Sequence, residues 1–153
     1  MKKFTSKSQK IGELGEDVAC KYLEKQGFYV LERNYTKKWG EIDIIAKKDD
    51  KLYFIEVKSV SRDLDENDTG EKGGRNVSGL SANQFSGAGE TVGFRPEENM
   101  HPRKLKRLGR TVGTYLIHNR IGNTEWQFDL LVVYLDMHKR LARVKVMENL
   151  ILG

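Results

Sequence analysis

The chain has few of the residues that build disulfide-linked or zinc-binding proteins. Cys20 is its only cysteine, so no intramolecular disulfide can form. The three histidines are spread along the chain and have no zinc-ligand spacing with Cys20. No stretch approaches the roughly 18 apolar residues that a membrane-spanning helix needs. We therefore expect a soluble, cytoplasmic protein with no membrane partner.

Length and charge restrict the remaining classes only weakly. The 153 residues suit one domain with an apolar core of its own. The formal net charge of +5 favours a polyanionic partner such as nucleic acid, although many basic proteins bind none. Function therefore has to be argued from particular residues.

Hydrophobic periodicity and turn residues predict two helices and five strands. The helices are expected at 10–27 and 101–119, and the strands at 28–36, 41–48, 52–60, 126–136 and 142–150. Residues 61–99 show no clear period and include seven glycines between positions 69 and 93, which predicts a flexible Gly-rich insertion in a single domain spanning 1–153. The order of the elements predicts an α/β fold in which helices flank a mixed central sheet.

Two of the expected strands carry charges where a sheet favours apolar residues. Side chains alternate between the faces of a strand, so Glu56 and Lys58 share a face with Phe54. Glu41 and Asp43 likewise share a face of the preceding strand. If the two strands pair across the short turn at residues 49–51, Asp43 lies close to Glu56.

These charges have two interpretations. A solvent-exposed Glu–Lys pair is common and contributes about 0–1 kcal/mol, but it would expose Phe54 as well. Alternatively, Asp43 and Glu56 hold a hard cation such as Mg²⁺, which prefers oxygen ligands. Lys58 would then orient a water molecule or stabilise the negative charge that develops during phosphoryl transfer. The pattern D-x(n)-E-x-K makes chemical sense as a phosphodiesterase site, although E-x-K alone is a weak motif.

The string GEID…EVK behind a helix that contains G-E-x-x-A closely resembles the YraN family of small bacterial proteins. That family is similar to archaeal Holliday junction resolvases and belongs to the PD-(D/E)xK nuclease superfamily. The resemblance is close over residues 10–60 and looser at 102–116 and 127–133. It implies a restriction-endonuclease-like α/β core, a nuclease activity that uses Mg²⁺ or Mn²⁺, and a possible homodimer, because resolvases act as dimers.

The resemblance also implies roles for individual residues. Asp43 and Glu56 would be metal ligands, with the Val57 carbonyl as a possible third, and Lys58 would be the catalytic lysine. Resolvase-like proteins add a glutamate from the first helix, and we favour Glu16 over Glu13. Glu16 occupies the matching position, and it lies on the flank of a helical stripe formed by four apolar residues: Ile11, Leu14, Val18 and Tyr22.

Other polar residues keep more than one interpretation. Glu41 either supports the metal site from beside Asp43 or only ends its strand at the exposed edge. Asp129 begins a strongly apolar strand, where a structural hydrogen-bonding role is favoured. The second helix carries a basic face, which either is solvated or contacts phosphates. Its members are Arg103, Lys106, Arg107 and Arg110. Lys104 projects near the edge of the apolar face and could reach the site.

The function that these features favour is a metal-dependent endonuclease acting on structured or branched DNA. The alternatives are a nucleic-acid-binding module without turnover and a scaffold protein built on a nuclease fold. The endonuclease needs Asp43 and Glu56 for activity. The binding module predicts salt-dependent binding that survives Asp43→Ala, and the scaffold would dock partners through residues 61–99.

Overall fold

The computed structural model describes residues 6–64, 74–76 and 100–152. In chain order the elements are α1 (Lys7–Lys25), β1 (Tyr29–Lys37), β2 (Gly40–Lys48), β3 (Lys51–Ser61), β4 (Gly74–Asn76), α2 (Pro102–His118), β5 (Trp126–Asp136) and β6 (Leu141–Met147). The two helices and five long strands confirm the predicted elements. Helix α1 starts earlier than the periodicity indicates because Ser6 caps it: the Ser6 hydroxyl accepts from the Gln9 N–H, and the Gln9 side chain accepts from the Ser6 N–H.

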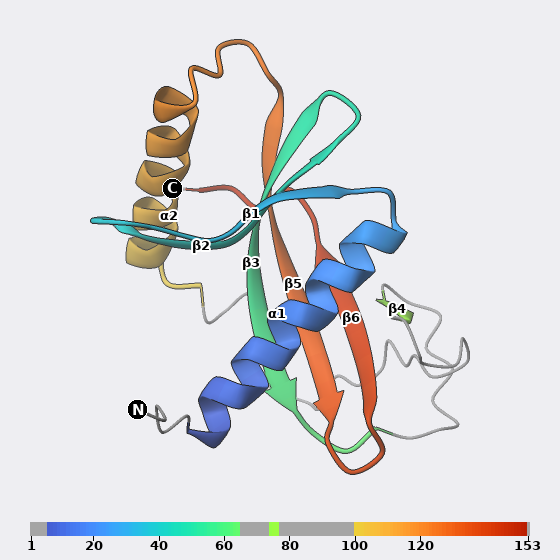
Figure 1. Ribbon diagram of the computed structural model, residues 1–153. Helices are drawn as coiled ribbons and strands as arrows, with labels where there is room; N and C mark the ends of the chain where they lie inside the picture. The colour runs from blue at the N-terminus through green and yellow to red at the C-terminus, as the bar shows by residue number, and fades with distance from the viewer. Residues whose placement is uncertain (1–5, 65–73, 77–99, 153) are drawn as a thin grey trace, which may run out of the picture.

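The strands form one mixed sheet in the order β1-β2-β3-β5-β6-β4. All neighbours are antiparallel except β3 and β5, which run parallel. The chain between these two strands includes α2, as a parallel pair requires a crossover. Figure 1 shows α1 lying across the sheet and α2 standing beside the β1–β2 hairpin. This is the predicted α/β fold with a restriction-endonuclease-like core.

Each helix covers its own apolar cluster. On the α1 side, Leu23 packs in a cluster with Ile55 of β3 and Leu131 of β5. On the α2 side, Phe54 packs in a second cluster with Val112 of α2. Phe54 and Ile55 are neighbours in β3, and neighbouring side chains of a strand point to opposite faces of the sheet. The two clusters therefore lie on opposite faces of the sheet.

The buried face of α1 differs from the predicted stripe. Leu14 is 38% exposed, whereas Gly15 and Ala19 are buried. A Cβ added at Gly15 would lie 1.7 Å from the Ser59 hydroxyl oxygen, so the glycine lets α1 approach β3 closely. The helix therefore turns its small residues toward the sheet and leaves Leu14 partly in solvent.

This close approach predicts a large difference between two glycines of the same helix. Gly15→Ala should lower the free energy of unfolding by about 1–2 kcal/mol, because overpacking at Ser59 outweighs the better helix propensity of alanine. Gly12→Ala is the matched control: its Cβ would meet nothing within 4 Å, so it should raise stability by roughly 0.5–1 kcal/mol. Urea unfolding of both variants measures the difference, and equal effects would contradict the close packing of α1 on β3.

Strand β2 leaves β3 at the level of Asp43. The β2–β3 ladder ends at the pair Ile44↔Ile55, and the start of β2 pairs with β1 alone. Strand β1 bends at the same level, where Asn34 has a φ of 54°. The hairpin formed by β1 and β2 therefore curves away from the central strands and reaches α2 (Figure 1).

The bend explains why residues two apart on β1 contact different helices. Arg33 forms an ion pair with Asp17 of α1, at 3.0 Å between Nη2 and Oδ1. Tyr35 instead packs edge-to-face on Tyr115 of α2, with ring centroids 5.2 Å apart. In a regular strand the two side chains would share a face. The bend thus opens the sheet between the helices.

Most of the expected Gly-rich insertion at 61–99 lies outside the described residues. Within it, β3 continues to Ser61, and the backbone of β4 pairs with β6. Leu64 is buried, and its N–H donates to Asp136 Oδ2 at 2.9 Å. Of the helices among the described residues, none is long and apolar enough to cross a membrane.

Candidate functional site

Asp43 lies where β2 separates from β3. Its Oδ2 accepts a hydrogen bond from the Val57 N–H at 2.8 Å. A regular ladder would satisfy that N–H with a backbone carbonyl of β2, but the ladder has already ended at Ile44↔Ile55. The Asp43 side chain takes the place of the missing strand, and the hydrogen bond holds its carboxylate at the opening. Val57 thus contributes its N–H, and the metal contact expected of its carbonyl stays a prediction.

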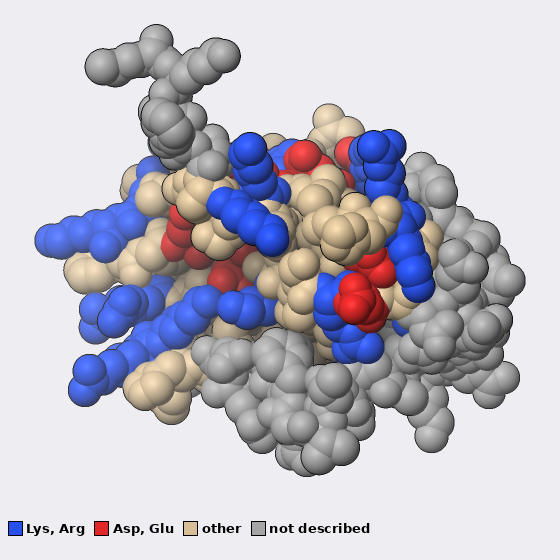
Figure 2. All heavy atoms as spheres, turned by 90° about the horizontal axis from the view of Figure 1, so that it is seen from below, with Lys and Arg blue, Asp and Glu red and all other residues tan. Residues whose placement is uncertain are grey.

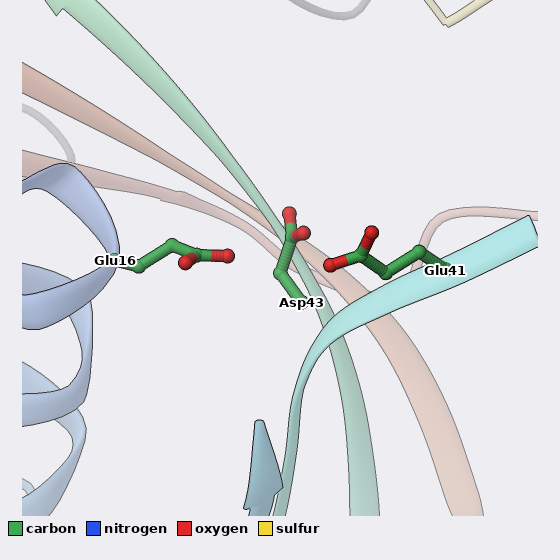
Figure 3. Close-up of side chains that lie close together, drawn as sticks. All are labelled: Glu16, Glu41 and Asp43. Atoms are coloured by element: carbon green, nitrogen blue, oxygen red, sulfur yellow. The ribbon is translucent and has the colours of Figure 1, made fainter. Parts of the chain in front are cut away.

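Three carboxylates converge at this opening. Glu16 of α1 and Glu41 of β2 each place a carboxylate oxygen so that these atoms and one of Asp43 all lie within 4.8 Å of one another. Figure 3 shows Glu16 and Glu41 pointing toward Asp43 from opposite sides. This arrangement agrees with the choice of Glu16, since Glu13 is exposed. It also places Glu41 at the site, and its carboxylate oxygen lies close enough to the other two to share a cation with them, which goes beyond the supporting position that the sequence left open.

Glu56 brings a fourth carboxylate from β3. Its side chain is only 13% exposed. Its charge raises the pKa of Asp43, so the two carboxylates are close together, as face alternation predicts. Glu56 Oε1 also forms an ion pair with Lys104 Nζ of α2, at 2.7 Å. Lys104 therefore reaches the site, as its place at the edge of the helix face indicates.

The crowding of these carboxylates changes their protonation. Burial and the neighbouring charge of Glu56 raise the pKa of Asp43 from 3.8 to about 8, although the Val57 N–H opposes the shift. Burial also raises the pKa of Glu16, against the charge of Arg33. Without a cation the cluster retains a proton near neutral pH, and a divalent cation can take the place of that proton.

Residues of β1 hold two of the carboxylates in position. Arg33 Nη2 lies 3.8 Å from Glu16 Oε2 as well as contacting Asp17. With its amide nitrogen turned toward the carboxylates, Asn34 donates to Glu41 Oε1 at 2.7 Å and to Glu16 Oε1 at 3.0 Å. The bend at Asn34 thus both opens the sheet and supplies a donor to the site.

The cluster opens into a cavity of about 580 Å³ between the β1–β2 hairpin and α2. Its walls combine acidic and basic side chains with one exposed tryptophan. They are formed by Trp39, Gly40, Glu41, Asp43, Glu56, His101, Arg103, Lys104, Arg107 and Leu108. Figure 2 shows acidic side chains in a recess flanked by projecting Lys and Arg side chains.

The predicted basic residues divide between the cavity and the outer surface. Arg103, Lys104 and Arg107 line the cavity. Arg110 lies against Trp39, with its guanidinium carbon 5.1 Å from the ring centroid. Lys106 is exposed and is not among the described residues that line the cavity. Helix α2 therefore presents three cations to the acidic cavity, while Lys106 is exposed outside the described lining of the cavity.

Lys58 differs from the predicted residues Asp43, Glu56 and Lys104 in its place relative to the cavity. It lies on β3 two residues beyond Glu56, its side chain is exposed, and it is not among the described residues that line the cavity. The described cation in contact with Glu56 is Lys104 instead. The catalytic role expected of Lys58 stays a prediction.

Asp129 is separate from this site. It is 5% exposed, and its Oδ1 accepts from the Gln127 side chain at 2.7 Å and from the Asn149 N–H at 2.9 Å. The second of these hydrogen bonds ties β5 to the segment after β6. The structural role favoured by the sequence is therefore confirmed.

Sequence reasoning missed the supporting residues of β1 and the hairpin tip. Face alternation placed Glu41 beside Asp43 but could not show that its carboxylate turns toward Glu16. Arg33 and Trp39 gave no signal of their own, because their positions depend on the bend in β1 at Asn34. The single hint was an asparagine inside a strand, since asparagine tolerates positive φ better than most residues.

Comparison with known proteins places the chain among bacterial relatives. The sequence model described as "Uncharacterised protein family UPF0102" matches residues 15–79. A UPF0102 protein of Campylobacter jejuni strain RM1221 is 36% identical over 126 residues, which cover 82% of this chain and 85% of the relative. One from Campylobacter lari is 34% identical over 139 residues, covering 91% of each chain. One from Clostridioides difficile strain 630 is 35% identical over 133 residues, covering 87% of this chain and 91% of the relative.

Proposed function

This chain belongs to the uncharacterised protein family UPF0102, the YraN family, and we propose that it is a metal-dependent endonuclease that hydrolyses phosphodiester bonds of structured or branched DNA. The observation that carries the proposal is the half-buried Asp43 at the point where two strands separate, surrounded by Glu16, Glu41 and Glu56. Acidic groups crowded in this way are costly to the fold unless a cation neutralises them.

The residues present fit a hard divalent cation. Their oxygens are the ligands that Mg²⁺ and Mn²⁺ prefer, and they come from rigid elements of the fold. The Val57 N–H occupies one oxygen of Asp43, which leaves the other for a metal. Asp43, Glu16, Glu41 and Glu56 would therefore hold the ion. When bound, it would lower the pKa of a water molecule and neutralise charge on a phosphate.

The basic side chains of α2 supply the contacts that a nucleic acid needs. Arg103 and Arg107 line the same cavity as Asp43 and Glu56, so their guanidinium groups can bind the phosphates that flank the one being cleaved. Such contacts position a strand without reading its sequence. Lys104 and Lys58 could stabilise the developing charge, because Lys104 already contacts Glu56 and Lys58 follows Glu56 on the same strand.

Cleavage of a panel of substrates tests the proposed function. Purified protein with Mg²⁺ or Mn²⁺ should cut at least one branched, nicked or flapped DNA, and Glu56→Ala should not. The absence of cleavage on every DNA and RNA shape, or equal cleavage by Glu56→Ala, would reject the endonuclease. The panel also separates DNA from RNA, and gel filtration with and without the preferred substrate checks the predicted homodimer.

A nucleic-acid-binding role without turnover is the second candidate, and the ion pair between Lys104 and Glu56 favours it. A lysine that neutralises Glu56 can stabilise the site without any metal. This role predicts salt-dependent DNA binding that survives Asp43→Ala in a protein that never cleaves. Binding that requires both the metal and Asp43 would reject it.

The same ion pair predicts an unusual effect on metal affinity. Lys104→Met should tighten Mn²⁺ binding by roughly 3–10-fold, because Glu56 is released from its partner and a positive charge leaves the site. Lys106→Met is the matched control, because Lys106 lies on the same helix and is exposed. The Mn²⁺ affinity of this variant should match that of the wild type. Isothermal titration with Mn²⁺ measures the difference. Weaker binding by Lys104→Met would show that the lysine does not compete with the metal.

A further inference from the structure

Trp39 is an exposed aromatic residue beside the carboxylate cluster. It lies in the turn between β1 and β2, is 40% exposed, and lines the same cavity of about 580 Å³ as Asp43 and Glu56. A flat apolar group of a ligand in this cavity would cover the exposed part of the Trp39 ring.

Two cations hold the Trp39 ring in place. The Arg110 guanidinium carbon lies 5.1 Å from its centroid, and Lys38 Nζ lies 5.3 Å from it. Arg110 belongs to α2, so this contact also ties the hairpin tip to the helix. Lys38 is an exposed lysine of the turn, and a ligand group can displace its ammonium from the ring at little cost. The ring is therefore pre-positioned by Arg110, and its other cationic contact, Lys38, is readily displaced.

The surroundings of the ring match a single strand of nucleic acid. Arg103 and Arg107 line the cavity beside Trp39 and can bind phosphates, while Asp43 and Glu56 lie across the same cavity. Sites for single-stranded nucleic acid combine basic grooves with aromatic side chains on which bases stack. A base pair in an intact duplex cannot offer its face to a side chain, so the base on Trp39 has to be unpaired.

We propose that Trp39 is a stacking platform for an unpaired nucleobase next to the phosphodiester held at the carboxylate cluster. The inference rests on the proposed function, because that function supplies nucleic acid as the ligand. It adds a reason for structure-selective cleavage: flaps, junctions and single-stranded tails offer an unpaired base, and intact duplex does not.

Trp126 provides a built-in control, because the protein has two tryptophans and they are equally exposed. Trp126 is also 40% exposed, but it lies at the start of β5 and packs edge-to-face on Phe54, with centroids 5.7 Å apart. It is not among the described residues that line the cavity. Trp126→Phe therefore leaves Trp39 as the only fluorophore of its kind, and Trp39→Phe leaves Trp126.

The experiment titrates both single-tryptophan proteins with a DNA hairpin that carries an oligothymidine tail, in EDTA so that no turnover occurs. Anisotropy of a dye on the DNA reports binding, and tryptophan emission reports stacking. We expect the emission of Trp39 to be quenched and that of Trp126 to stay constant. Trp39→Ala should weaken binding on the order of tenfold, and a tail of abasic sites should abolish the difference between Trp39→Ala and wild type.

Failure of the inference differs from failure of the proposed function. If the hairpin binds but Trp39 is not quenched, or Trp126 is quenched equally, the stacking platform is refuted while the endonuclease stands. If no DNA binds in EDTA, the stacking platform is refuted, while the metal-dependent endonuclease is judged by the cleavage panel with Mg²⁺ or Mn²⁺. Quenching of Trp39 in a protein that never cleaves supports the platform and rejects the endonuclease. Thermal melting of each variant confirms that the compared proteins are folded.

Discussion

Asp43→Asn should lower the affinity for Mn²⁺ on the order of a hundredfold or more and abolish cleavage. The substitution removes the negative charge at the centre of the cluster but keeps an amide oxygen that can still accept from the Val57 N–H. Strands β2 and β3 should therefore keep their positions while the site loses its central ligand. Residues that only support metal ligands typically contribute 10–100-fold in affinity, and a direct ligand contributes at least as much.

Asp129→Asn is the matched control for this change. Asp129 also accepts a backbone N–H, from Asn149, but it is buried on β5 outside the cluster. Its substitution should leave Mn²⁺ affinity unchanged, whatever it does to stability. Electron paramagnetic resonance of free Mn²⁺ measures both variants. Equal affinities for Asp43→Asn and wild type would place the metal elsewhere.

The metal-free protein should lose stability as pH rises from about 4 to about 8. The pKa of Asp43 is about 8 in the folded protein and near 3.8 when unfolded. Between these values the folded state binds the extra proton, so the free energy of unfolding falls as pH increases. The contribution of Asp43 is fully present below about pH 4 and is lost as pH rises through about 8.

Asp43→Asn isolates this contribution because asparagine does not titrate. In EDTA the variant should match the wild type near pH 4 and exceed its stability by roughly 2–4 kcal/mol at pH 8.5. Urea unfolding at both pH values gives the comparison. Saturating Mg²⁺ should remove the advantage of the variant, since the metal stabilises only the wild-type site. A variant less stable than wild type at pH 8.5 in EDTA would contradict the crowding of the carboxylates.

The strands and the central pair of the site could be predicted because they depend on local rules. Alternation along β2 and β3, together with the short turn between them, was enough to bring Asp43 near Glu56. Helical geometry combined with the family resemblance pointed to Glu16 rather than Glu13. Each of these inferences needs only the periodicity of one element or the pairing of two neighbours.

The rest depends on how distant elements meet. The buried face of α1 is set by the close approach of Gly15 to Ser59, which no apolar stripe within the helix reveals. The positions of Arg33, Asn34 and Trp39 follow from a bend at one residue with positive φ. The contact between Lys104 and Glu56 was foreseen only as a possibility, because the distance between α2 and β3 is fixed by packing across the whole sheet.

The most direct test of a metal site at the carboxylate cluster is anomalous diffraction from a crystal grown with Mn²⁺. We predict an anomalous peak bound by Asp43 Oδ1 and by carboxylate oxygens of Glu16, Glu41 or Glu56, with Lys104 displaced from Glu56. A fully occupied peak elsewhere, or no peak at the cluster at saturating Mn²⁺ with Lys104 still paired to Glu56, would contradict the account.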